Sequence, residues 1–294
     1  MAAMSGFDRN ICSDKLLYID LLKKVLTASI YEESGWYIIE RSDPTWDKSR
    51  SFVANASKYI RQIIDNLEVE SKSKRSLLIV KKRSLTAEAR DQGAYWPLMG
   101  LTMVGRARLD NVQDCIEHVI SNNIPGDIIE TGAWRGGVTI LARALLKLYG
   151  ITDRKVWVAD SFEGLPRPKS EADGWDYSKV DFLKVSLDTV KANFDSFGML
   201  DNQVVFLKGW FSETLPTAPI DRLAVLRLDG DLYSSTMDSL ANLYDKVSPG
   251  GFVIVDDYNS WPSCKAAVSD FIDRRKISAD IHEIDSSGVY WQVT

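Results

Sequence analysis

The sequence predicts an α/β fold, in which an open and mostly parallel β-sheet is covered by helices on both faces. Between residues 93 and 294, short apolar runs alternate with segments whose apolar residues recur at helical spacing. Five such strand–helix alternations follow one another, a pattern typical of parallel sheets with crossover helices. The last two apolar runs are joined instead by Asp285-Ser-Ser-Gly288, a short polar turn that predicts an antiparallel hairpin.

The predicted elements follow in a regular order after residue 93. Leu141, Leu145 and Leu148, for example, share one face of a predicted helix. The predicted helices are residues 111–122, 138–149, 186–197, 234–247 and 263–275, and the predicted strands are residues 127–130, 155–160, 203–207, 223–228, 251–255, 280–284 and 289–293. The Pro-Gly-Gly sequence at residues 249–251 predicts a turn before the fifth strand.

The chain before residue 93 is less regular. Residues 14–30 predict an amphipathic helix, whereas the stretch that follows has no clean long period. Residues 72–83 hold six basic residues and no acidic one, which indicates either a solvated loop around a short strand or a docking patch for an acidic partner. We therefore expect an N-terminal extension, residues 1–92, that contributes to a lid or to oligomer contacts, and a catalytic domain at residues 93–294.

Composition disfavours several classes of function. With 36 basic and 41 acidic residues, the net charge of −5 argues against a surface that grips nucleic acid. No apolar run approaches the ~20 residues that cross a bilayer, and the first ten residues do not resemble a signal peptide. Three widely spaced cysteines without a CxxC pair suit a reducing cytoplasm. Since there are only two histidines, any metal must be held by carboxylates.

Acidic residues gather where the predicted strands end. In an open α/β sheet, ligands bind beyond the carboxyl ends of the strands. Glu130, Asp160, Gly209, Asp229 and Asp256 each lie at or just past such an end. The sequence therefore predicts four carboxylates along one edge of the sheet.

The first strand leads into a glycine-rich turn, Glu130-Thr-Gly-Ala-Trp-Arg-Gly-Gly137. Its glycines allow the backbone to approach a ligand, although their spacing departs from the dinucleotide pattern GxGxxG, and a tight turn without a ligand is the alternative. Glu130 together with Asp160 suits a ligand that carries an amino group and a ribose, whereas a pyrophosphate would be repelled by Glu130. This combination favours S-adenosylmethionine (SAM) over NAD.

Four aspartates follow two neighbouring strands. Asp229 and Asp231 flank a glycine, and Asp256 and Asp257 are adjacent. Like charges this close repel unless they share a proton or a cation, and hard oxygen ligands suit Mg²⁺ or Mn²⁺. Each aspartate can instead cap a helix or a turn. Four of them on two strand ends favour a metal site.

Several motifs resemble those of the macrocin O-methyltransferase family. The motifs are Thr102-Met-Val-Gly-Arg-Ala-Arg-Leu-Asp-Asn111, Gly126-Asp-Ile-Ile-Glu-Thr-Gly-Ala-Trp-Arg-Gly-Gly137, Val156-Trp-Val-Ala-Asp-Ser-Phe-Glu-Gly164, Leu226-Arg-Leu-Asp-Gly-Asp-Leu-Tyr233 and Pro249-Gly-Gly-Phe-Val-Ile-Val-Asp-Asp-Tyr258. The resemblance implies the class I SAM-dependent methyltransferase fold, with a seven-stranded sheet that ends in an antiparallel hairpin. It also implies a metal- and SAM-dependent enzyme that methylates hydroxyl groups, mostly of sugars on natural products, and that forms a homo-oligomer.

The resemblance further implies roles for individual residues. Asp231 would be the general base, and His282 is a secondary candidate whose alternative is a structural role in the hairpin. The Mg²⁺ ligands would be Asp229, Asp256 and Asp257. The implied cofactor-binding residues are Thr102, Met103, Glu130, Thr131, Gly132, Ala133, Arg135, Asp160, Ser161, Gly209, Trp210 and Asp229.

Other functions stay open from the sequence alone. They are a catechol-type O-methyltransferase acting on an aromatic diol, a binding module without turnover, and an NAD-dependent dehydrogenase. Within the family reading, the default acceptor is a deoxysugar hydroxyl. Because the stretch before residue 93 departs from the family pattern, a polyketide or peptide hydroxyl, free or carrier-bound, is an alternative, and an acidic carrier would suit residues 72–83.

Overall fold

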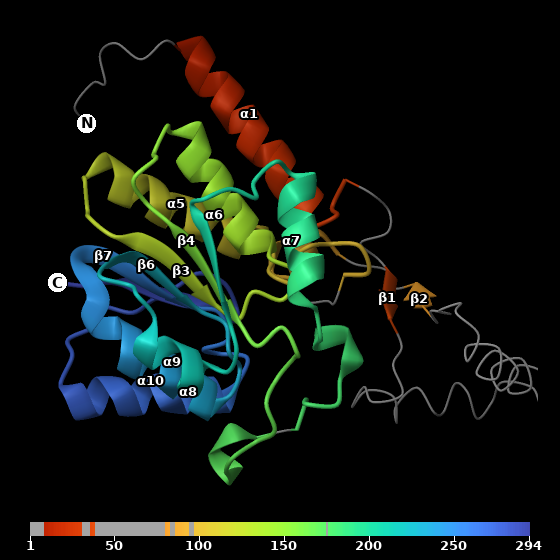
Figure 1. Cartoon of the computed structure of the whole chain (residues 1–294). Coiled ribbons are helices and arrows are strands. Elements are labelled where there is room, and N and C mark those ends of the chain that lie inside the picture. The colour runs from red at the N-terminus through yellow and green to blue at the C-terminus, as the bar shows by residue number, and fades with distance from the viewer. Residues whose placement is uncertain (1–8, 31–35, 39–79, 83–85, 94–96, 175) are drawn as a thin grey trace, which may run out of the picture.

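The computed structural model describes residues 9–30, 36–38, 80–82, 86–93, 97–174 and 176–294 (Figure 1). Its centre is a seven-stranded sheet with the strand order β5-β4-β3-β6-β7-β9-β8. The strands are β3 (Asp127–Thr131), β4 (Val156–Asp160), β5 (Val204–Lys208), β6 (Leu223–Leu228), β7 (Val247–Val255), β8 (His282–Glu283) and β9 (Val289–Gln292). Strands β3 to β7 are parallel, whereas β9 pairs antiparallel with both β7 and β8. The predicted sheet and its C-terminal hairpin are confirmed.

Helices cover both faces of the sheet (Figure 1). One face carries α1 (Arg9–Leu26), α5 (Arg106–Ser121), α6 (Gly137–Leu148) and α7 (Leu187–Ser196), and the other carries α8 (Phe211–Thr214), α9 (Tyr233–Leu243) and α10 (Pro262–Arg275). The short helix α4 (Ala87–Asp91) packs against α5. Within the described residues, no helix is both long enough and apolar enough to cross a bilayer.

Successive strand residues face opposite helical layers. In β3, Ile128 lies in the core under α5 and α6, whereas Ile129 lies in the core under α9 and α10. In β4, Val158 likewise lies in the core under α5 and α6, whereas Trp157 lies in the core under α9 and α10. Both faces of these strands are therefore buried, which explains why they read as nearly continuous apolar runs.

Helix α1 packs in the same unit as the sheet. Its Leu22 and Leu26 lie in the core shared with α5 and α6. The buried ammonium of Lys23 pairs with Asp110 of α5, with an Nζ–Oδ1 distance of 2.6 Å. The division at residue 92, and a role of the extension in a lid or an oligomer, stay predictions. Most of the basic segment 72–83 lies outside the described residues, which there include only β2 (Val80–Lys82), paired with β1 (Trp36–Ile38).

The predicted turn at residues 249–251 is wrong. Strand β7 begins at Val247 and runs through all three residues, and the helix predicted to reach residue 247 ends as α9 at Leu243, followed by the 3₁₀ turn η5 (Tyr244–Lys246). The register between β6 and β7 shifts opposite this stretch. Gly250 has a φ of +84°, and a Cβ on Gly251 would lie 2.7 Å from the carbonyl oxygen of Ala224. The glycines therefore mark an irregularity within β7, and not a turn that precedes the strand.

The sheet has a switch point between β3 and β6. The chain proceeds from β3 through β4 to β5 on one side, and from β6 to β7 on the other. Gly132, just after β3, has a φ of +99°, and a Cβ there would lie 1.7 Å from the carbonyl oxygen of Asp229. Only glycine allows the two strand ends to approach this closely. Such a switch point is where open α/β sheets bind ligands.

Candidate active site

A pocket of about 370 Å³ opens at the carboxyl ends of β3, β4, β5 and β6. The predicted site residues that line it are Met103, Gly132, Asp160, Ser161, Gly209, Trp210, Asp229 and Asp231. Other walls come from residues 164–169 and from the first turns of α8 and α9. The structure thus brings together residues from five separate segments of the predicted site.

Asp160, the last residue of β4, fixes the shape of the glycine-rich turn. Its Oδ2 accepts hydrogen bonds from the backbone N–H groups of Ala133 (2.8 Å) and Trp134 (3.1 Å), and its Oδ1 accepts one from Phe162 (2.7 Å). Burial raises the pKa of Asp160, and these amides oppose that shift. The carboxylate therefore joins the turns after β3 and β4, and its contact with a ribose stays a prediction.

Arg135 does not line the pocket. Its Nη1 donates to the carbonyl oxygens of Leu98 (2.9 Å) and Gly100 (2.8 Å), and its guanidinium stacks 4.1 Å from the centre of the Trp134 ring. The indole Nε1 of Trp134 in turn donates to the carbonyl of Phe182 (3.0 Å). Burial lowers the pKa of Arg135 to about 10, so it remains a cation at neutral pH. Arg135 therefore anchors the loop at residues 98–100 to the glycine-rich turn, and its contact with the cofactor stays a prediction.

Three further predicted cofactor residues are buried and do not line the pocket. Thr102 accepts a hydrogen bond from the N–H of Val104 (3.2 Å), and Thr131 accepts one from the hydroxyl of Ser239 (3.2 Å). Ala133 contributes the backbone N–H already described. Their contact with a ligand stays a prediction.

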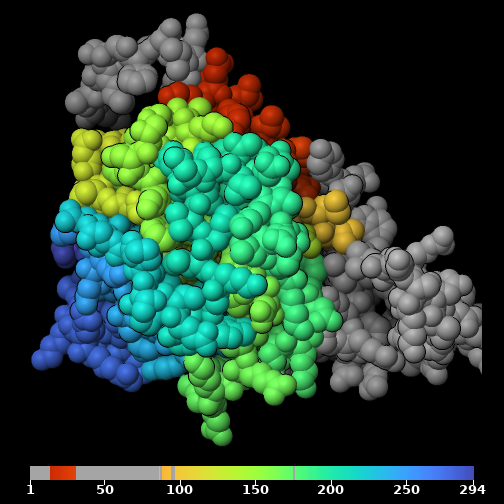
Figure 2. Space-filling view, viewed as in Figure 1, coloured from red at the N-terminus to blue at the C-terminus, as the bar shows by residue number. Residues whose placement is uncertain are grey.

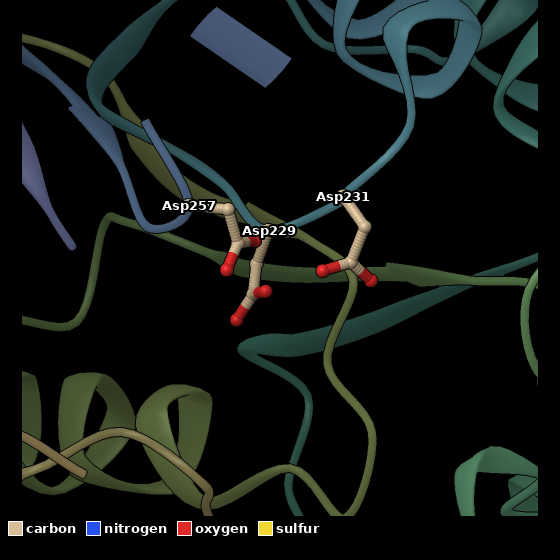
Figure 3. A group of neighbouring side chains, drawn as sticks. All are labelled: Asp229, Asp231 and Asp257. Carbon is tan, nitrogen blue, oxygen red and sulfur yellow. The ribbon is translucent and has the colours of Figure 1, made fainter. Parts of the chain in front are cut away.

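Three carboxylates converge beyond β6 and β7 (Figure 3). One oxygen from each of Asp229, Asp231 and Asp257 lies within 4.8 Å of the others. Burial, together with the charge of Asp229, raises the pKa of Asp231 to about 7, and burial with the charge of Asp231 raises that of Asp257. Charging all three is therefore unfavourable unless a cation is present. This donor set fits a hard divalent cation such as Mg²⁺ or Mn²⁺.

Asp256, predicted as a metal ligand, lies outside this cluster. One of its oxygens accepts a hydrogen bond from Arg227, and the other accepts one from Arg108. The side chain is 5% exposed, and both oxygens face guanidinium groups. Asp231, and not Asp256, therefore lies together with Asp229 and Asp257, and the role of Asp256 as a metal ligand stays a prediction.

Two buried arginines hold the acidic residues, and the sequence reasoning did not identify them. Arg227 in β6 is 2% exposed, and its Nη1 donates both to Glu130 and, at 2.8 Å, to Asp229. Arg108 in α5 is 7% exposed and also pairs with Asp285, with an Nε–Oδ2 distance of 2.9 Å. The signal in the sequence was Arg227 itself, a single basic residue inside the apolar run of β6. A buried cation requires carboxylate partners, so this position predicts that acidic side chains lie next to it.

Glu130, at the end of β3, is 3% exposed. One of its oxygens accepts from Arg227, whereas Oε2 has no hydrogen-bond partner in the described part of the chain. Burial raises the pKa of Glu130 to about 8, although Arg227 acts in the opposite direction. A buried, unpartnered carboxylate oxygen can be satisfied by a ligand that donates hydrogen bonds, such as an ammonium group.

His282 lies away from the pocket. It is on the edge strand β8, where its Nε2 is 3.3 Å from Oδ2 of Asp280 and its ring is 5.4 Å from that of Tyr290. Its side chain is 53% exposed. The structure does not bring His282 to the acidic cluster, and this geometry agrees with the alternative of a hairpin side chain.

Comparison with known proteins identifies the family. The family profile described as Macrocin-O-methyltransferase matches residues 15–293. The chain belongs to the macrocin O-methyltransferase family. It is 43% identical over 287 residues to demethyldecarbamoylnovobiocin O-methyltransferase of Streptomyces niveus, a match that covers 96% of this chain and 95% of that protein.

A further relative and a solved structure support the assignment to the macrocin O-methyltransferase family. The chain is 43% identical over 283 residues to 8-demethyl-8-(2,3-dimethoxy-alpha-L-rhamnosyl)-tetracenomycin-C 4'-O-methyltransferase of Streptomyces olivaceus, covering 95% of this chain and 93% of that protein. The solved structure of the O-methyltransferase NovP matches with a TM-score of 0.76 and 42% identity, covering 95% of this chain and 99% of that one. The chain is therefore a SAM-dependent O-methyltransferase of the class I fold, which confirms that prediction over a dehydrogenase or a binding module.

Proposed function

We propose that this enzyme methylates a sugar hydroxyl of a natural product, with a divalent cation held at Asp229 and Asp257. The observation that carries the proposal is the convergence of three carboxylates at the edge of the pocket. The relative from Streptomyces olivaceus supports the acceptor class, because its name contains a rhamnosyl group and the position 4'-O. The relative from Streptomyces niveus carries the name of another natural product, demethyldecarbamoylnovobiocin.

Glu130 and Gly132 fit the methionine end of SAM. The buried Oε2 of Glu130 lacks a partner among the described residues and suits the ammonium group of the ligand. Gly132 leaves the turn open to close approach, because it carries no Cβ. We assign Asp160 and Ser161 to the ribose, and Gly209 and Trp210 to the adenine, since these pairs follow the next two strands along the pocket. SAM supplies a methyl group activated by its sulfonium charge.

Asp229 and Asp257 are the proposed protein ligands of the cation. Their oxygens meet from the ends of two neighbouring strands (Figure 3), and burial raises the pKa of both carboxyls. Arg227 donates to Oδ2 of Asp229 and thereby holds that side chain in place. A divalent cation supplies Lewis acidity, which lowers the pKa of a bound hydroxyl.

Asp231 is the proposed general base. It lines the pocket, and no basic side chain within the described residues pairs with its carboxylate. Its backbone is held by Ser263, whose hydroxyl donates to the Asp231 carbonyl at 3.0 Å. Asp231 takes the proton that the acceptor hydroxyl loses as its oxygen gains the methyl group.

We also propose a homo-oligomer in a reducing cytoplasm. Helix α1 exposes apolar side chains, with Leu17 at 68% and Leu21 at 52% exposure, and these suit a contact between copies. Cys115 and Cys264 are both free and buried, which is compatible with a reducing compartment. Light scattering on the purified enzyme tests the oligomer, since a mass of one chain would contradict it.

The central experiment is methyl transfer from SAM to a panel of acceptors, followed by mass spectrometry. The panel pairs each glycosylated natural product with its sugar-free aglycone and adds an aromatic diol. We expect methylation of the sugar, loss of activity with EDTA and recovery with Mg²⁺ or Mn²⁺. Methylation of the aglycone alone would refute the sugar assignment, and full activity of the metal-free enzyme would refute the cation.

A further inference from the structure

A segment at residues 164–174, which we call the cover segment, forms one wall of the pocket. It follows β4, and it appears in green at the lower edge of Figure 2. Gly164, Leu165, Pro166, Arg167 and Lys169 line the pocket. Most of its later residues are exposed, so its own apolar burial contributes little to holding it in place.

Asp173 is the exception, because it is fully buried in this exposed stretch. It lies in the 3₁₀ turn η2 (Glu171–Asp173), and its Oδ2 accepts hydrogen bonds from the backbone N–H groups of Lys169 (2.7 Å) and Ser170 (3.3 Å). Its Oδ1 accepts one from the N–H of Ser234 (2.7 Å), in the first turn of α9. One carboxylate therefore joins the cover segment to a helix that is distant in sequence.

These hydrogen bonds suit an ionised carboxylate. Burial alone would raise the pKa of Asp173, but the amides of Ser234 and Lys169 outweigh it and hold the pKa below its usual value. The N-terminus of α9 favours a negative charge as well. At neutral pH the connection is thus made of charge-assisted hydrogen bonds, which are stronger than neutral ones.

Asp231 lies in the loop between β6 and α9, and Ser234 follows it by three residues, inside α9. Asp231 has a φ of +55°, a left-handed conformation that is uncommon for a residue with a side chain. Such a conformation persists only where the surroundings hold it. Two of the contacts that hold it are the Ser263 hydroxyl, which donates to the Asp231 carbonyl, and the Asp173 carboxylate, which accepts from Ser234 where the loop enters α9.

We propose that Asp173 is a positioning residue, which couples the cover segment to the loop that carries Asp231. The pocket wall and Asp231 then hold their places as one unit, and loosening the wall displaces Asp231. The effect on turnover rests on the proposed role of Asp231, whereas the structural coupling does not depend on it.

The test is Asp173→Asn, which keeps the shape of the side chain but turns an NH₂ group toward at least one N–H donor. Hydrogen exchange of the ligand-free enzyme should become faster in two peptides, one over residues 165–174 and one over residues 231–236. The kcat should fall about tenfold or more, the change expected for loss of a hydrogen bond to a charged group. The KM for SAM should stay unchanged, because the proposed SAM contacts lie elsewhere.

The matched control is Asp176→Asn. Asp176 is nearby and also accepts a backbone N–H, that of Ser178 at 2.9 Å, but it is exposed and its contact is local. This variant should leave both the exchange and the kcat unchanged. If Asp173→Asn does not fold, Asp173→Glu, which keeps the charge but displaces it, must show the same paired effect.

Faster exchange confined to residues 165–174, with residues 231–236 and the kcat unchanged, would show that Asp173 shapes only its own turn and would overturn the proposal. Unchanged exchange in both peptides would overturn it too. If the unsubstituted enzyme transfers no methyl group, the proposed function fails, but the exchange experiment still decides whether the two segments are coupled.

Discussion

Replacing Arg227 by methionine should destabilise the folded enzyme, because it removes the buried cation that three carboxylates share. Methionine is of similar length and is tolerated in cores, so the loss of charge dominates over any loss of packing. Arg227 is 2% exposed and donates to Glu130, Asp229 and Asp256. Asp256 retains Arg108 as a second partner and the Asp229 side chain is 27% exposed, so the buried carboxyl group left without a partner is mainly Glu130, whose side chain is 3% exposed.

The magnitude follows from burial. Removing one partner of a buried ion pair typically costs about 3–5 kcal/mol, because the remaining charge is left without solvent or counter-ion. At about 2 °C per kcal/mol for a chain of this size, the Tm should fall by roughly 6–10 °C. Differential scanning fluorimetry of the ligand-free enzyme measures this shift.

Arg143→Met is the matched control. Arg143 is 5% exposed and pairs with Asp201, with an Nη2–Oδ2 distance of 2.6 Å, but the Asp201 side chain is 33% exposed. Water can therefore solvate Asp201 when the arginine is lost, and the destabilisation should be smaller. A Tm loss for Arg227→Met no greater than that of Arg143→Met would refute the reasoning.

The pH dependence gives a second check on the same variant. Burial raises the pKa of Glu130 to about 8 even with Arg227 present, so its folded pKa lies above its unfolded one. Such a carboxyl group favours the folded state at low pH, and that contribution is lost as the pH rises through the folded pKa. Without Arg227 the pKa of Glu130 rises further, so above pH 8 this group stays protonated in the folded variant but ionises in the folded unsubstituted enzyme. The Tm difference between the two proteins should therefore be larger at about pH 9.5 than at pH 5. Equal differences at the two pH values would contradict the account.

Three other predictions address the proposed site. Asp231→Asn should bind SAM normally in calorimetry but lower the kcat by about 10²–10⁴-fold, and near-normal turnover would place the proton acceptor elsewhere. Glu130→Gln should raise the Kd for SAM by about tenfold or more, because a charge-assisted hydrogen bond is lost, and an unchanged Kd would exclude this contact. The affinity for Mn²⁺ should rise from pH 6 to pH 8, because the pKa of Asp231 is about 7 in the metal-free enzyme and protons oppose cation binding. A flat profile would exclude Asp231 from the neighbourhood of the cation.

The fold was predictable because its strands are buried on both faces. A strand such as β6 (Leu223–Leu228) reads as an apolar run with definite ends, and its predicted and observed bounds agree. Strand β7 was harder to delimit, because Pro249-Gly-Gly251 has the composition of a turn but lies within the strand. A bulge depends on how two strands register against each other, which the local sequence does not determine.

The site was predictable as a collection of acidic strand ends but not in its internal pairing. Asp256 and Asp257 are adjacent, and successive strand residues face opposite sides of a sheet. Asp256 continues the alternation of Phe252 and Ile254, which face the core under α5, and it meets Arg108 of α5 there. That parity was the signal that separates Asp256 from the cluster of Asp229, Asp231 and Asp257. Its use requires knowing that α5 packs on this face, which is tertiary information.

The contacts on this face of the sheet also suggest what an arginine does inside β6. A buried ion pair is seldom more stable than well-packed apolar residues, so stability alone does not account for Arg227. Its Nη1 is shared by Glu130 and Asp229, the proposed contacts of the SAM ammonium and of the cation. Without a guanidinium group, these carboxylates would repel one another and turn apart. With one guanidinium group for each carboxylate, their charges would be neutralised and the site would hold no cation. Arg108 and Arg227 are fewer than the acidic residues around them, so they orient the carboxylates without neutralising all of them. The negative charge that remains is then balanced by positively charged ligands.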